Sequence, residues 1–85
     1  MVNKALPDLK PGENAIVSKL RTTGAMRRRF LDIGLVQGTQ VECIGKSPLG
    51  DPSAYMIRGS VIAIRREDSR GILISLQGDA DGVDA

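Results

Sequence analysis

The alternation of apolar and polar residues predicts a chain built mostly of short strands. Apolar residues recur at every second position over residues 13–21, 39–46 and 71–77, which is the period of a strand with one buried face. Two further short runs, residues 54–58 and 60–66, flank Gly59, so the pattern predicts a hairpin that turns at this glycine with positive φ. Leu6 and Leu9 are the expected anchors of an otherwise irregular lead-in.

A helical period occurs once, between the first and the second of these strands. Met26, Phe30 and Ile33 are spaced i, i+4 and i+7, which places them within about 60° of one another around a helix. The spacing therefore predicts a helix over residues 24–33 whose stripe of three apolar side chains is buried.

Both ends of this helix carry recognisable signals. Thr22 or Thr23 can cap the first turn by accepting a backbone N–H. Gly34 follows the last apolar position, and glycine is the residue that most often ends a helix in the left-handed conformation.

Five short strands with one short α-helix between the first and second strands indicate a mainly β fold, a small and strongly bent five-stranded β-barrel. A chain of 85 residues favours a single domain. We expect residues 1–78 to form that domain and residues 79–85, which hold three aspartates, to form a flexible acidic tail.

The composition excludes several classes of function. The chain has no histidine and a single cysteine, Cys43, so Ser-His-Asp catalysis, Cys-His catalysis and zinc fingers are excluded. Cys43 shares the strand period of Val41 and is expected to be a buried thiol. We therefore expect no enzyme, no cofactor and no metal site. Residues 1–20 lack the apolar run of a signal peptide, which favours a soluble, cytoplasmic protein.

Three consecutive arginines in the predicted helix are the most distinctive feature of the sequence. Helical geometry places Arg28 and Asp32 on the outer face and Leu31 beside Arg27, away from the buried stripe. An exposed leucine among arginines is a plausible contact for a partner, but Leu31 could equally pack on a barrel edge. The helix and its exit loop give the candidate partner-binding residues: Arg27, Arg28, Leu31, Asp32 and Leu35.

A second group of basic residues surrounds the fourth strand: Arg58, Arg65 and Arg66. They form a candidate secondary basic patch, although arginines at strand ends often only mark where the core stops. Residues 1–78 carry twelve Lys and Arg against seven Asp and Glu, a net charge of +5. An alternative function is therefore a small nucleic-acid-binding β-barrel that uses its arginines on phosphates. With only two aromatic residues available for base stacking, we expect no nucleic acid partner.

Several short motifs resemble those of FeoA-type ferrous iron transport accessory proteins. The segment GAMRRRFLDIGLVQGTQVE, residues 24–42, has the glycine, the arginine-rich helix, the Leu-Asp-Ile-Gly stop and the Gly-Thr pair of that family in order. The second half agrees through its Gly-Asp-Pro loop, its Arg-Gly turn and its Ile-Arg-Arg-acid strand end. Gln37 stands where the family often has proline, and Ser69 where it often has alanine. The resemblance runs from about Leu6 to Leu76.

The resemblance implies an SH3-like β-barrel, in agreement with the strand pattern. It also implies a non-enzymatic, cytoplasmic accessory or regulatory protein of ferrous iron uptake. Its expected partner is an FeoB-type membrane iron transporter, a class that carries a cytoplasmic G-protein domain. The acidic residues 79–85 lie outside the resemblance.

Overall fold

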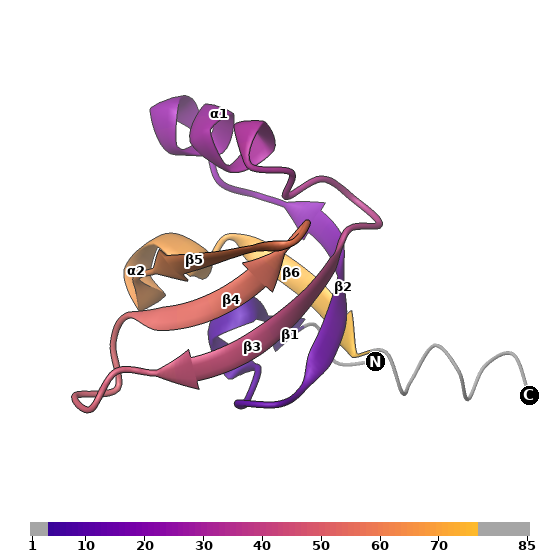
Figure 1. Cartoon of the computed structure of the whole chain (residues 1–85). Coiled ribbons are helices and arrows are strands. Elements are labelled where there is room, and N and C mark those ends of the chain that lie inside the picture. The colour runs from indigo at the N-terminus through magenta and orange to yellow at the C-terminus, as the bar shows by residue number, and fades with distance from the viewer. Residues whose placement is uncertain (1–3, 77–85) are drawn as a thin grey trace, which may run out of the picture.

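A computed structural model describes residues 4–76, which form one antiparallel sheet of six strands in the order β1-β6-β2-β3-β4-β5 (Figure 1). The strands are β1 (Lys4–Ala5), β2 (Asn14–Leu20), β3 (Gln40–Lys46), β4 (Ser53–Ile57), β5 (Ser60–Ile64) and β6 (Ile72–Leu76). A 3₁₀ helix η1 (Leu6–Asp8), a helix α1 (Gly24–Asp32) and a one-turn helix α2 (Arg66–Ser69) complete the fold.

The expected closed barrel of five strands is wrong in its strand count and its closure. The sixth strand is β1, whose two residues pair with β6 at Ile74 and Leu73. Two residues are too few to show a strand period, so the hydrophobic pattern could not reveal this strand. The sheet ends at β1 and β5 without closing, and α1 follows the second strand rather than the first.

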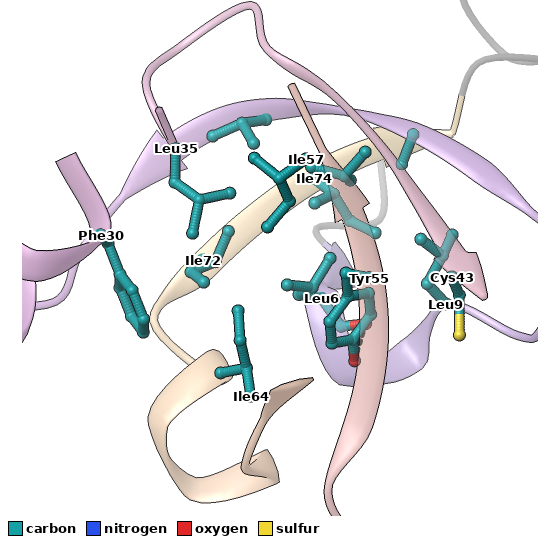
Figure 2. Close-up of a cluster of buried hydrophobic side chains, with 13 residues drawn as sticks. Leu6, Leu9, Phe30, Leu35, Cys43, Tyr55, Ile57, Ile64, Ile72 and Ile74 are labelled. Carbon is teal, nitrogen blue, oxygen red and sulfur yellow. Dashed lines mark hydrogen bonds between the residues drawn. The ribbon is translucent and has the colours of Figure 1, made fainter. Parts of the chain in front are cut away.

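The core lies on one face of the bent sheet and draws side chains from every strand except β1 (Figure 2). Its buried members are Leu6, Leu9, Ala15, Val17, Phe30, Leu35, Val41, Cys43, Tyr55, Ile57, Ile64, Ile72 and Ile74. Cys43 is fully buried as expected, because its strand position alternates in step with Val41. Apolar burial on this scale is the main source of stability for so small a domain.

The β4–β5 hairpin confirms the turn predicted at Gly59. Only Arg58 and Gly59 separate the paired residues Ile57 and Ser60, and both have positive φ, 50° and 85°. Positive φ at both central residues is what a two-residue turn needs to match the twist of its strands. The structure thus places an arginine, a non-glycine residue, in the left-handed region.

The N-terminal segment is anchored in the core by two leucines. Leu6 and Leu9 are fully buried, which confirms them as anchors. The hydroxyl of Tyr55 donates a long hydrogen bond of 3.4 Å to the carbonyl oxygen of Leu6. Strand β4 and the lead-in are therefore tied together across the core.

The largest difference from a predicted boundary is at the end of β5. The fourth predicted strand was expected to reach residue 66, but β5 ends at Ile64 because α2 begins at Arg66. The backbone N–H of Arg66 donates to Oδ1 of Asp51 at 2.9 Å, which satisfies a free donor at the start of α2. The expected acidic tail, residues 79–85, lies outside the described residues.

Candidate interaction surface

Helix α1 packs on the core through one buried side chain, that of Phe30. Phe30 is 2% exposed, whereas Met26 and Ile33 are partly buried and pack against the core from its margin. The three residues lie on one side of α1, as their spacing predicted. The opposite side of the helix is left to solvent (Figure 1).

The start of α1 is fixed by an arginine rather than by a threonine cap. Thr23 occupies the N-cap position, but no side chain caps the helix there, so the predicted threonine cap is wrong. Instead, Nη1 of Arg27 donates to the carbonyl oxygens of Leu20 at 2.8 Å and Thr22 at 3.4 Å. Arg27 therefore ties the first turn of α1 to the chain that leaves β2.

The end of α1 forms a Schellman motif, and this motif corrects the placement of Leu35. Gly34 has a φ of 100°, its N–H bonds to the carbonyl of Leu31, and the N–H of Leu35 bonds to that of Phe30. This reversal drives Leu35 back into the core beside Phe30, where it is fully buried (Figure 2). Leu35 consequently lies in the core and not on the partner-binding surface predicted from the sequence.

The remaining four candidate residues come together on the outer side of α1. Together with Gly24 they line a shallow hollow of about 450 Å³: Arg27, Arg28, Leu31 and Asp32. Leu31 is 39% exposed, so it lies at the surface and not on a barrel edge. We call these five residues the α1 surface. It combines an accessible apolar side chain with charges of both signs.

The predicted secondary basic patch is divided by strand β5. Arg58 precedes β5 in the hairpin turn, whereas Arg65 and Arg66 follow its last residue. The five residues of β5 span about 17 Å at ~3.3 Å per residue. Arg58 also packs on the helix exit, because a Cβ at Gly34 would overlap its side chain. The three arginines therefore do not form one continuous site.

Sequence patterns did not point to a smaller hollow between α1 and β5. It measures about 150 Å³ and has an apolar floor that includes Met26, Phe30, Ile62 and Ile64. Its polar residues are Arg29, Arg65 and Asp68. One signal was present in the sequence: Ile62, Ala63 and Ile64, which line this hollow, belong to the apolar run of residues 61–64. We call this hollow the β5 groove.

Comparison with known proteins assigns the chain to a family. The FeoA domain family matches residues 4–76, which is the whole described part of the chain. The chain belongs to the FeoA family.

Two relatives above 25% identity support this assignment. A fusion of Fe(2+) transport protein A with the Fe(2+) transporter FeoB from Porphyromonas gingivalis is 32% identical over 71 residues, 84% of this chain. The chain spans only 8% of the length of that relative. The solution structure of the FeoA protein from Chlorobium tepidum is 34% identical, with a TM-score of 0.82 over 87% of this chain and 70% of that one.

A more distant FeoA structure shows that the fold is SH3-like. FeoA from Stenotrophomonas maltophilia, a prokaryotic SH3 domain protein solved as a zinc complex, is 22% identical. Its TM-score is 0.76 over 85% of this chain and 89% of that one. The zinc belongs to that protein. In residues 4–76 of the present FeoA chain, no three His, Cys, Asp or Glu side chains gather closely enough to hold a metal ion.

The chemistry of the FeoA core bears on the alternative functions. Both aromatic side chains, Phe30 and Tyr55, are buried, so neither can stack on a nucleotide base. Burial also raises the pKa of the Cys43 thiol above its ordinary value of 9.0. A buried, protonated thiol is a poor nucleophile. Within the described range, no helix is long and apolar enough to cross a membrane.

Proposed function

We propose that this FeoA protein is a non-enzymatic, cytoplasmic accessory protein of ferrous iron uptake that binds an FeoB-type membrane transporter. The observation that carries the proposal is the Porphyromonas gingivalis relative, in which an FeoA region and an FeoB transporter form one polypeptide. Two domains joined in one chain in one organism commonly act together when they are separate chains in another. We infer the same association here, between separate molecules.

The α1 surface is the contact that we assign to this partner. Leu31 supplies an apolar anchor, and Arg28 and Asp32 beside it supply charges at its rim, the arrangement typical of an interface centre with a polar border. The helix is fixed at both ends by Arg27 and the Schellman motif. A helix that is already formed before binding loses less conformational entropy on association than a disordered segment would.

The test is a double substitution on the α1 surface, Leu31→Ala with Arg28→Glu. We avoid Arg27, since its hydrogen bonds hold the helix and its loss would confuse folding with binding. The expected result is at least a tenfold weaker interaction with the cytoplasmic part of the transporter, and slower iron uptake in cells. The melting temperature should change little, because both side chains are exposed.

A matched control is available on a distant strand. Ile44→Ala with Lys46→Glu removes an apolar side chain of similar exposure, 44%, and reverses one positive charge on β3. This variant should bind the transporter normally. Equal weakening by both variants would show that only net charge matters. Normal binding by the Leu31 variant would place the contact elsewhere, and no binding by the unmodified protein would refute the FeoB-type partner itself.

A further inference from the structure

Within residues 4–76, strand β5 is an uncovered edge of the sheet. In this range it pairs only with β4, through five residue pairs that run from Ile57 with Ser60 to Ser53 with Ile64. Its exposed side chains include Val61 and Ala63, and Val61 is the second most exposed large apolar side chain among residues 4–76. An edge strand of this length presents backbone groups that can pair with another chain.

The register shows which backbone groups are free. In a two-residue hairpin the pair next to the turn, here Ile57 with Ser60, exchanges both backbone hydrogen bonds, and such pairs then alternate along the ladder. The pairs that contain Val61 and Ala63 are therefore the non-bonded ones. The N–H and C=O groups of these two residues point away from β4. Among the described residues, no turn or loop hydrogen bond uses them.

The β5 groove lies beside this edge and is suited to side chains of an added strand. Its floor includes Phe30 and Ile64, both buried, and the half-buried Ile62. At about 150 Å³ it can take an apolar group of roughly the size of benzene. Side chains of an added strand alternate, so every second one can face this floor.

The charge around the edge is mainly positive. Arg29 of α1 and Arg65 at the end of β5 line the groove, against one half-buried acid, Asp68. Arg58 stands at the other end of the strand, in the hairpin turn. An added segment that carries carboxylates can pair with these arginines while its apolar side chains enter the groove.

We propose that β5 is a docking site at which an extended, acidic segment of a partner protein adds to the sheet as a further strand. Its backbone pairs with Val61 and Ala63, an apolar side chain enters the β5 groove, and its carboxylates meet Arg29 and Arg65. This is recognition by strand addition, in which the main chain supplies affinity and the side-chain pockets supply specificity.

The same observations disfavour two other occupants. A second copy of this chain, paired antiparallel along β5, would bring the Arg58 end of each strand against the Arg65 and Arg66 end of the other. Like charges placed opposite one another are destabilising. A nucleic acid could use the arginines, but it would leave the free backbone groups of β5 without strand partners.

This site is separate from the α1 surface proposed above. The α1 surface contains Arg28 and Leu31, whereas the β5 groove contains Arg29 and Phe30, which lie on a different side of the helix. The inference goes beyond the proposed function, and its test needs no transporter. A failure of one proposal therefore leaves the other standing.

The probe is a synthetic eight-residue peptide in which two adjacent central valines are flanked by glutamates, so that one valine can enter the groove while glutamates two positions away lie on the same face as Arg29 and Arg65. It is added to the full chain at 150 mM salt and followed by amide NMR. The expected result is saturable binding, with the amide exchange of Val61 and Ala63 slowed at least tenfold. A matched peptide with lysine in place of glutamate should bind at least tenfold more weakly. The glutamate peptide with every backbone nitrogen methylated, which can donate hydrogen bonds along neither edge, should not bind.

Two single charge reversals locate the site on the protein. Arg65→Glu should weaken binding of the glutamate peptide at least tenfold. Arg28→Glu makes the same change of charge on the α1 surface and should alter binding of the peptide less than threefold, because Arg28 does not line the β5 groove. Both arginines are exposed, so both variants should remain folded.

Four results would overturn the proposal. They are no binding at millimolar peptide, equal binding of the lysine peptide, equal binding of the methylated peptide, and equal weakening by the two charge reversals. Sedimentation of the protein alone as a dimer with Val61 and Ala63 already protected would assign the edge to a second copy. Protection of the same amides by a single-stranded oligonucleotide at 150 mM salt would assign it to nucleic acid.

Discussion

Arg58 and Gly59 determine how the β4–β5 hairpin meets the rest of the molecule. Both residues have positive φ, a conformation that is unfavourable by about 1–2 kcal/mol for a residue with a side chain. Arg58 occupies it and lays its side chain against Gly34, where a Cβ would force the arginine side chain to move. The turn therefore fixes both the start of β5 and the contact between the hairpin and the exit of α1.

The first prediction concerns Gly59, whose φ is 85° and around which a Cβ would meet no atom within 4 Å. Gly59→Ala should lower the free energy of unfolding by about 1 kcal/mol, through backbone conformation alone. The measurement is the urea midpoint. Gly45→Ala is the matched control, because Gly45 is equally uncrowded but does not have positive φ. That control should be neutral or slightly stabilising, and equal losses in the two variants would contradict the explanation.

The burial of Leu35 follows from a signal that the sequence contains, the glycine at the end of α1. A glycine that ends a helix in the left-handed conformation is usually followed by an apolar residue that packs back on the last turn. Gly34 gives this signal in the sequence, and it favours a buried Leu35 over the surface position assigned from the helix exit. In the structure the N–H of Leu35 donates to the carbonyl oxygen of Phe30, and the Leu35 side chain is buried beside Phe30.

At the scale of elements, α1 depends on few contacts for its position. One fully buried side chain, Phe30, holds its middle, and the Arg27 side chain holds its first turn. Elements with few buried contacts open more readily than the core. The orientation of the α1 surface therefore relies on Arg27.

The second prediction tests this role of Arg27. Arg27→Ala should speed hydrogen exchange of the α1 amides by about fivefold, the equivalent of ~1 kcal/mol for hydrogen bonds from a charged donor. Amides of β2 and β6 should be unaffected. Arg28→Ala is the control, since Arg28 lies on the same helix and is exposed. Equal acceleration in both variants would mean that helix propensity, and not the bonds to Leu20 and Thr22, explains the effect.

The elements that could be predicted from the sequence are those long enough to show a period. Strands β2 to β6 and α1 were located within about two residues of their observed ends, because five to nine residues suffice to show alternation or a helical stripe. Strand β1, with two residues, shows none, and its pairing with β6 depends on contacts distant in sequence. The β5 groove was missed for the same reason, since it is formed by residues from α1, β5 and α2.

On the scale of the whole molecule, the open sheet has two edge strands, β1 and β5, which differ in length and in their surroundings. At the β1 edge, two residues of the strand, Lys4 and Ala5, fall in the described range, and η1 follows at once with Leu6 buried in the core. Short edge strands resist pairing with other chains. At the other edge no described residue pairs with the outer side of the five-residue strand β5, which lies beside an apolar groove with arginines around it. This asymmetry is what makes β5 a more suitable docking edge than β1.

The third prediction concerns the stability of the whole molecule at alkaline pH. Burial raises the pKa of the Cys43 thiol above 9.0 and that of the Tyr55 hydroxyl above 10.0. The unfolded chain releases these protons at the ordinary values, whereas the folded chain retains them, so their contribution to stability is complete below pH 8 and is lost as the pH rises past 9. The free energy of unfolding, measured in urea, should fall by at most about 1.4 kcal/mol per pH unit for each group. The Cys43→Ala variant should be less stable at every pH, because the substitution leaves a cavity. Between pH 9 and 10 its free energy of unfolding should fall less steeply with pH than that of the unmodified protein. Equal slopes for the variant and the unmodified protein would contradict the assignment to Cys43.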